Sequence, residues 1–410
     1  MSRTERKPRL LVLSQVYPPD PASVGQHMGD AAEEMVRRGW DVKVLTSARG
    51  YDDSSIRYES HEDRNGVDVR RLPLSSFGKR HFLLRALAAI LFMLQTIVRG
   101  LFAGKSDVLL VSTSPPMCIV AALVIRMFRR TSIKFWVMDI NPDQLIALGA
   151  IKPTSFSARI MDFFNRWILR KADDVIVLDR FMGDSMMKKL DVRSKLHTMP
   201  PWPHEDHLET VPRDENPFRK EHGLQDKFVF MYSGNHAIGL PLKTFLDAAV
   251  TFKDDPKIVF LFVGGGVRKK EVEEAIATHD LKNMISLPYQ PIENLRYSLS
   301  TADVHLVGVG DDMVGVVHPC KIYGAMAVGR PILLLGPDPC HVSDLVHQNN
   351  IGWHIGIGDY EKAKHVIREI ADTPRPELDA MGERSLQAVR DQLSKDRLCG
   401  MFCDVLEGKA

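Results

Sequence analysis

The stretch Phe228–Phe245, FVFMYSGNHAIGLPLKTF, joins an apolar run to a segment with helical spacing. Phe228–Tyr232 is short, apolar and aromatic-rich, which is typical of a buried strand. Leu242–Val250 has the spacing of a helix, and Gly234 in the gap lets the backbone bend sharply and approach a ligand. The start of a helix presents unpaired N–H groups that attract anions. The stretch therefore predicts a strand–loop–helix unit whose loop receives an anion.

The same alternation of apolar runs and helical segments extends along the chain in two series. The first series of runs is Leu10–Val16, Val42–Thr46, Val108–Ser112, Ile133–Met138 and Val175–Leu178, with helices expected at Gly25–Arg38, Met117–Phe128 and Phe181–Leu190. The second is Phe228–Tyr232, Ile258–Val263, Ile285–Leu287, Val304–Val307 and Ile332–Leu335. Such alternation is typical of parallel sheets covered by helices on both faces. The sequence predicts the α/β class, with two doubly wound Rossmann-like domains facing a cleft.

The Pro-rich, polar patch Met199–Gly223 separates the two series. We therefore assign residues 1–205 to an N-terminal domain and 206–380 to a C-terminal domain. The helical run near Pro376–Leu406 closes the chain, and we treat 381–410 as a separate segment whose return to the first domain is left open. Ligands of such domains bind beyond the carboxyl ends of the strands.

The composition is that of a soluble globular protein. The 410 residues are 44% hydrophobic and 26% charged, with a net charge of +2. The five scattered cysteines suit a reducing compartment, and the pair Cys399 and Cys403 lacks the further ligands that zinc requires. The apolar run near the N-terminus, Leu10–Leu13, is too short for a signal peptide. These features predict a cytoplasmic protein.

One region combines apolar and basic residues. Between Arg70 and Arg130 there are ten Lys and Arg but a single acid, Asp107. Within it, Phe82–Phe102 is strongly apolar, yet only 13 uncharged residues separate Arg85 from Arg99, fewer than a membrane span needs. Two interpretations remain open, a buried core helix and a helix lying in the membrane interface. The basic flanks favour the interface because anionic head groups attract them.

The loop after Phe228–Tyr232 carries the first candidate phosphate site. The Gly234 backbone, the donors of Asn235 and His236, and the charge of Lys243 together suit a diphosphate. A plain turn is the alternative.

A second candidate lies in Gly315–Gly336, GVVHPCKIYGAMAVGRPILLLG. Pro319 is placed as a first-turn residue after His318, and Lys321 falls at the start of the same helix, where a cation opposes the dipole. An anion sharing this space would explain that cation, whereas the alternative is that Lys321 points into solvent.

Other loops are weaker candidates. Gly265, within the Gly264–Gly266 run, suits close packing under a nucleotide, and Tyr289 lies in an extended segment that can offer backbone groups to a base. Gly25, near a helix start, is a candidate for admitting a phosphate or sugar. Asp139 follows an apolar strand, where a carboxylate can accept a proton or hold sugar hydroxyls. A helix cap is the alternative for Asp139.

Taken together and in order, these motifs resemble the retaining GT-B glycosyltransferases of family four. They are SDVLLVSTSPP, VMDINPD, ADDVIVLDRFM, MYSGNH, LFVGGG and HPCKIYGAMAVGRPIL. The branch that the chain resembles builds bacterial surface polysaccharides and includes fucosamine-transferase and colanic-acid-type enzymes. The resemblance covers nearly the whole chain.

The resemblance implies a function and its partners. It implies a nucleotide-sugar donor held by the C-terminal domain, with its diphosphate on the loop at Gly234–His236. It implies a polyprenyl-diphosphate-linked acceptor bound by the N-terminal domain at the inner face of the plasma membrane, reached through residues 82–130. The transferred group would be a hexosyl or N-acetylhexosaminyl unit. No metal or other cofactor is expected, and no nucleic-acid partner.

The chain departs from the family pattern at one point. Many relatives carry two glutamates eight positions apart near the donor sugar, and these positions hold Val316 and Gly324 here. Asp311 and Asp312 lie nearby but out of register.

We therefore expect a glycosyltransferase in which His236 and Lys321 stabilise the leaving diphosphate and Asp139 orients the acceptor hydroxyl. Two alternatives stay open: a nucleotide-sugar epimerase of the same fold, which needs no acceptor, and a catalytically silent membrane-associated scaffold.

Overall fold

The computed structural model describes residues 6–51, 53–75, 82–115, 118–204 and 208–409. By its internal contacts the chain divides into two compact units. The first holds residues 1–202, 315–317 and 396–410, and the second holds 203–314 and 318–395. The boundary that we placed at residue 205 falls outside the described residues. Within the segment 381–410, whose return was left open, the first unit takes in the residues from Asp396 onward.

The first unit is built on an eight-stranded sheet of order β3-β4-β2-β1-β5-β6-β7-β8. Its strands are β1 (Arg9–Leu13), β2 (Asp41–Ser47), β3 (His61–Arg64), β4 (Val67–Leu72), β5 (Val108–Ser112), β6 (Ser132–Val137), β7 (Asp174–Val177) and β8 (Leu196–Thr198). All neighbours are parallel except β3 and β4, which form an antiparallel edge. The strand order reverses between β1 and β5.

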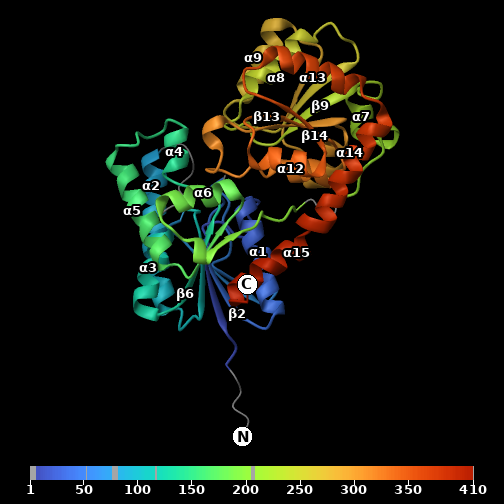
Figure 1. The fold of residues 1–410 in the computed structure, drawn as a ribbon. Coiled ribbons are helices and arrows are strands. Elements are labelled where there is room, and N and C mark those ends of the chain that lie inside the picture. The colour runs from blue at the N-terminus through green and yellow to red at the C-terminus, as the bar shows by residue number, and fades with distance from the viewer. Residues whose placement is uncertain (1–5, 52, 76–81, 116–117, 205–207, 410) are drawn as a thin grey trace. The chain divides into compact units, whose positions relative to one another are not determined.

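Helices cover both faces of this sheet (Figure 1). They are α1 (Ser23–Arg37), α2 (Phe82–Phe102), α3 (Cys118–Arg129), α4 (Asp143–Ala147), α5 (Phe156–Lys171), α6 (Arg180–Lys189) and the C-terminal α15 (Lys395–Glu407). Helix α15 is fixed to α1 because Arg38 donates to Asp404 at 2.6 Å and to Glu407 at 2.8 Å. The end of the chain thus belongs to the first unit.

The second unit has a six-stranded parallel sheet of order β11-β10-β9-β12-β13-β14. Its strands are β9 (Phe228–Ser233), β10 (Ile258–Val263), β11 (Met284–Leu287), β12 (Val304–Gly308), β13 (Ile332–Leu335) and β14 (Gly352–Ile355). The order reverses between β9 and β12. Loops that follow these two strands therefore meet at the edge where doubly wound sheets bind ligands.

The helices of the second unit pack on both faces of its sheet (Figure 1). They are α7 (Pro217–Glu221), α8 (Leu242–Thr251), α9 (Lys269–His279), α10 (Leu295–Ser300), α11 (Lys321–Ala327), α12 (His341–Asn349), α13 (Tyr360–Asp372) and α14 (Arg375–Ala388), followed by a π-helical turn at Val389–Leu393. Apolar side chains of alternate strand positions form a core on each face. The predicted architecture of two Rossmann-like α/β domains is confirmed.

Candidate functional site

The loop after β9 bends at Gly234 and packs backbone against backbone on the loop after β10. Gly234 and Gly264 both have a φ of +133°, a conformation that favours glycine. A Cβ at Gly264 would stand 2.0 Å from the carbonyl oxygen of Gly234, and one at Gly266 would stand 2.7 Å from that of His236. The two loops can approach this closely only because side chains are missing.

We predict that Gly264→Ala disturbs this loop pair. The added methyl group would collide with backbone, which cannot rotate away as a side chain does, and the φ of +133° is itself unfavourable for alanine. The expected result is a lower thermal midpoint together with weaker binding of nucleoside diphosphates, measured by scanning fluorimetry with and without the nucleotide. Gly149→Ala is the matched control, because its φ is also positive but nothing lies within 4 Å of its Cβ position. Equal losses in both variants would contradict this account of the loops.

Lys321, the first residue of α11, reaches the bend after β9 from the connection that follows β12. Its Nζ donates to the carbonyl oxygen of Asn235 at 2.8 Å and to the hydroxyl of Tyr232. Its Cε would be 2.7 Å from a Cβ on Gly234, so the side chain lies directly on the bend. Within the described residues, one of the three ammonium donors is left for a ligand. Burial lowers the pKa of Lys321 to about 8.

His236 is fully buried beneath the same loop. Its backbone N–H donates to the carbonyl oxygen of Gly265 at 2.7 Å, and its Nδ1 lies 3.2 Å from that oxygen. The ring packs edge-on against Tyr232, and burial lowers the pKa of His236 below its ordinary value, which favours the neutral imidazole. In this conformation the backbone N–H and Nδ1 of His236 support the loop from inside, and its buried Nε2 has no hydrogen-bond partner among the described residues. The phosphate contact of His236 stays a prediction.

Three further predicted residues lie at the edge of these loops. Asn235 is exposed. Gly265 lies under Tyr289, whose ring carbon would be 2.9 Å from a Cβ on the glycine. The Tyr289 residue is 60% exposed, so its ring presents a flat surface above the glycine loop. Gly265 therefore has the role of close packing, while Tyr289 offers a side chain where we had expected only backbone groups.

Two other predicted residues have partners of their own. The Lys243 side chain is 71% exposed and pairs with Asp247 one turn along α8 at 2.8 Å. His318 lies 2.7 Å from the Tyr323 hydroxyl through Nε2, and Tyr323 lies 2.9 Å from Nε2 of His341. Lys321 contacts Gly234 and Asn235 directly, and His236 follows them in the same loop. In the part of the chain that the structure describes, the ion pair of Lys243 is with Asp247.

In the first unit, Asp139 follows the carboxyl end of β6. Its backbone N–H donates to Oγ1 of Thr113 at 3.1 Å, and its Oδ1 lies 3.5 Å from Nε2 of Gln144. Burial raises the pKa of Asp139 to about 6. A carboxyl group with such a pKa at a sheet edge can exchange a proton near neutral pH.

Gly25 has a packing role in the structure. It is the third residue of α1, and a Cβ there would stand 3.0 Å from the backbone of both Val16 and Tyr17. The loop after β1 thus packs against Gly25 where a side chain would otherwise stand, and the contact of Gly25 with a phosphate or sugar stays a prediction.

Tyr232 is the residue of this site that sequence reasoning missed. Its hydroxyl donates to the carbonyl oxygen of Asn235 at 2.7 Å and also contacts the Lys321 ammonium, whose Nζ lies 4.8 Å from the ring centroid. A tyrosine at the end of an otherwise apolar strand was the available signal, because its hydroxyl must find a partner at the sheet edge.

Helix α2 of the first unit exposes an apolar stripe. We define this α2 stripe as the exposed side chains at one-turn spacing, Leu87, Ile90, Leu94, Val98 and Phe102. Phe102 is 83% exposed, and Met127 and Phe128 at the end of the neighbouring α3 are exposed as well. No helix that the structure describes is long and apolar enough to cross a bilayer.

Family models match the two units in turn. Residues 23–202 match the Glycosyl transferase 4-like domain, and residues 214–387 match Glycosyl transferases group 1. These ranges together take in most of the chain.

Individual proteins show the same likeness. The chain is 26% identical to the probable glycosyltransferase WbjE of Pseudomonas aeruginosa, over 78% of this chain and 80% of that protein. It is 25% identical to the putative colanic acid biosynthesis glycosyl transferase WcaI of Escherichia coli, over 78% and 81% of the two chains. Among solved structures, Anabaena Alr3699/HepE in complex with UDP-glucose superposes with a TM-score of 0.72 at 13% identity, over 98% of this chain and 99% of that one. The last likeness concerns the fold.

Proposed function

Because the chain belongs to the glycosyltransferases that join a Glycosyl transferase 4-like domain to a Glycosyl transferases group 1 domain, we propose that it moves a sugar from a nucleotide-diphosphate donor to a polyprenyl-diphosphate-linked saccharide. Transfer takes place at the cytoplasmic face of the membrane and retains the anomeric configuration. The name of the relative WcaI, a putative colanic acid biosynthesis glycosyl transferase, supports a role in bacterial surface polysaccharide synthesis.

The observation that carries the donor side of this proposal is the position of the Lys321 ammonium on the Gly234 bend. The two phosphates of a nucleotide sugar can be bound by the bent backbone at Gly234, by the N–H groups at the start of α8 and by the remaining donor of the Lys321 ammonium. The exposed ring of Tyr289 suits the base. The binding of UDP-glucose by HepE, which shares the fold, supports a donor of this class.

Transition-state stabilisation follows from the same groups. As the bond from the sugar to the diphosphate breaks, negative charge grows on the leaving phosphate. A partly desolvated ammonium held in place by Asn235 and Tyr232 stabilises that charge without reorganising. Lys321 thereby supplies the charge that a divalent cation supplies elsewhere, and we expect transfer to persist in the presence of EDTA.

The acceptor side of the proposal rests on the first unit. The α2 stripe and the basic residues that flank it suit a helix lying in the interface of an anionic membrane. A lipid-linked saccharide presents its sugar at that surface. Asp139, with its pKa near 6, is the proposed group that orients the acceptor hydroxyl.

Incubation with labelled sugar nucleotides and bacterial membrane extract tests this function. We expect one label to enter the lipid fraction with the protein and not without it. An epimerase would instead convert the donor with no acceptor present, and a silent scaffold would leave it unchanged. The configuration of the product, read by NMR coupling constants, tests retention separately.

The pKa of Lys321 leads to a pH prediction for donor binding. The free ammonium loses its proton as the pH rises through about 8, whereas a bound diphosphate favours the charged form and raises this pKa. Nucleotide binding should therefore weaken above pH 8, and the complex should take up a proton on Lys321 there. The terminal phosphate of the nucleotide does not contribute to this uptake, because its pKa is about 6 and it is already ionised. Calorimetry in buffers of different ionisation enthalpy measures this uptake. In Lys321→Arg the uptake should vanish, and its persistence in that variant would assign the proton to another group.

A further inference from the structure

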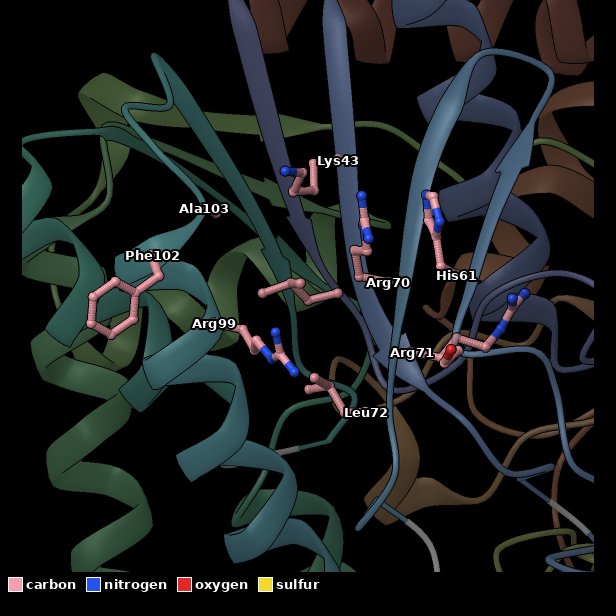
Figure 2. Close-up of a pocket in the computed structure, with 10 residues that line it drawn as sticks. Lys43, His61, Arg70, Arg71, Leu72, Arg99, Phe102 and Ala103 are labelled. Atoms are coloured by element: carbon pink, nitrogen blue, oxygen red, sulfur yellow. The ribbon is translucent and has the colours of Figure 1, made fainter.

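The first unit holds a basic pocket at the end of α2. Its volume is about 310 Å³, and its lining includes Lys43, His61, Arg70, Arg99 and Phe102. In Figure 2, Lys43, Arg70 and His61 rise from the neighbouring strands β2, β4 and β3, and Arg99 extends from α2. The pocket lies along the sheet from Lys43 in β2 to Leu72 at the end of β4, and Asp139 is not among its lining residues.

The pocket carries an excess of positive charge. One carboxylate, Asp68, is shared among three basic side chains, with distances of 3.2 Å to Lys43, 2.7 Å to Arg70 and 3.2 Å to His61. Burial alone would raise the pKa of Asp68, but its bonds to Arg70 and Lys43 outweigh this and hold it below its usual value. Among the described residues, no carboxylate pairs with Arg99. A compact anion would therefore find several donors that one aspartate does not satisfy.

The surroundings of the pocket are apolar on one side. Phe102 lines the pocket and is also the last member of the α2 stripe, and Val98 precedes it by one turn. An interfacial helix inserts its apolar side chains among acyl chains while its cations meet the head groups above them. The pocket volume far exceeds the roughly 30 Å³ of a water molecule and accommodates a phosphodiester group.

We propose that this pocket binds the phosphodiester head group of an anionic membrane phospholipid, with Arg70 and Arg99 as its principal donors. Arginine suits this role because its guanidinium makes paired, charge-assisted hydrogen bonds to phosphate. The lipid tails then run beside Phe102 and the α2 stripe. This inference rests on the proposed membrane location, but it does not depend on the transfer chemistry.

Binding of the full-length protein to vesicles tests the pocket. Vesicles of phosphatidylcholine alone are compared with vesicles that also contain phosphatidylglycerol, and neither contains an acceptor. The pocket variant is Arg70→Gln with Arg99→Gln, and the control is Lys105→Gln with Arg130→Gln, which removes the same charge from exposed positions outside the pocket. Thermal midpoints verify that both variants fold.

We expect wild-type protein to bind only the anionic vesicles. The control should weaken binding by at most about fivefold for each charge removed. The pocket variant should weaken it at least about tenfold more, because specific hydrogen bonds to phosphate are also lost. Equal losses in the two variants would overturn the assignment. A second outcome would also overturn the assignment: free glycerol 3-phosphate stabilises the wild-type protein, while the pocket variant binds vesicles as well as wild type does. That result would mean that the pocket binds a soluble anion rather than a lipid.

The same variants separate this inference from the proposed function. Transfer to a short, water-soluble acceptor analogue should be equal in wild type and pocket variant. If wild type transfers no sugar at all, the proposed function fails, whereas the vesicle comparison still decides the pocket.

Discussion

Replacing Lys321 by alanine should lower the rate of sugar transfer by about two to three orders of magnitude, the usual cost of removing one preorganised donor to developing charge. The ammonium lies on the Gly234 bend and holds one donor free for the leaving phosphate. The measurement is kcat/KM for transfer to a lipid-linked acceptor. The fold should survive, because the Tyr232 hydroxyl still donates to the carbonyl oxygen of Asn235 at 2.7 Å when the lysine is absent.

Two companion variants sharpen this result. Lys321→Arg keeps the charge but not the compact shape, so it should recover part of the rate. Lys243→Ala removes a lysine of the same unit that is exposed and paired with Asp247, and the rate should change little. Equal losses for Lys321→Ala and Lys243→Ala would mean that general positive charge, rather than the placed ammonium, supports the reaction.

Asp303→Asn should destabilise the second unit by about 3–5 kcal/mol, the cost of leaving a buried cation without its counter-ion. Asp303 is 1% exposed and lies just before β12. It accepts from Arg213 at 2.9 Å, pairs with the buried Arg219 at 3.4 Å, and also bonds Arg375. These arginines belong to three separate segments, so one carboxylate ties the start of the unit and α14 to the sheet.

The measurement is the thermal midpoint, which should fall by roughly 10 °C for a unit of this size. Asp247→Asn provides the control, because it also removes an aspartate from an ion pair, but from an exposed one, and should cost less than about 1 kcal/mol. Similar midpoints for the two variants would show that the Asp303 network contributes little to stability.

The fold was largely predictable because buried parallel strands leave a strong local signal. Val108–Ser112, Ile258–Val263 and Ile332–Leu335 are nearly all apolar, and the predicted bounds of these three strands agree with the structure. The strands that were missed are short or half-polar, and they include the edge strands β3 and β14 and the interior strand β4 (Val67–Leu72), in which polar and charged residues interrupt the apolar ones. The edge strand His61–Arg64 has no apolar residue. The edge strand Gly352–Ile355 contains a glycine, a tryptophan and a histidine before its single aliphatic residue. An edge strand is defined by its pairing with a neighbour, which short-range patterns do not contain.

The site was predictable only in part, because its geometry depends on burial. Gly234 and Lys321 were identified from a bend and a misplaced cation, and the structure joins them across 87 positions of sequence. His236 was predicted from the same loop as a phosphate donor, yet its side chain is fully buried under that loop. Gly25 likewise packs against its own preceding loop. Residue type indicates what a side chain can do, but the direction in which it points is set by contacts distant in sequence.

The basic pocket was also only partly predictable from the sequence. The excess of arginine and lysine between Arg70 and Arg130 was visible in the sequence, but Lys43 and His61 lie outside that range. Only the pairing of β2, β4 and β3 brings these residues together around Asp68.

The central claim is that the Gly234 bend and Lys321 hold the diphosphate of a sugar nucleotide. The most direct test is to titrate wild-type protein and Lys321→Ala with nucleoside diphosphates and the matching monophosphates by calorimetry. We predict that wild type binds its preferred diphosphate at least about tenfold more tightly than the monophosphate, the value of one charged hydrogen bond, and that this preference disappears in the variant. An unchanged preference in Lys321→Ala would contradict the claim.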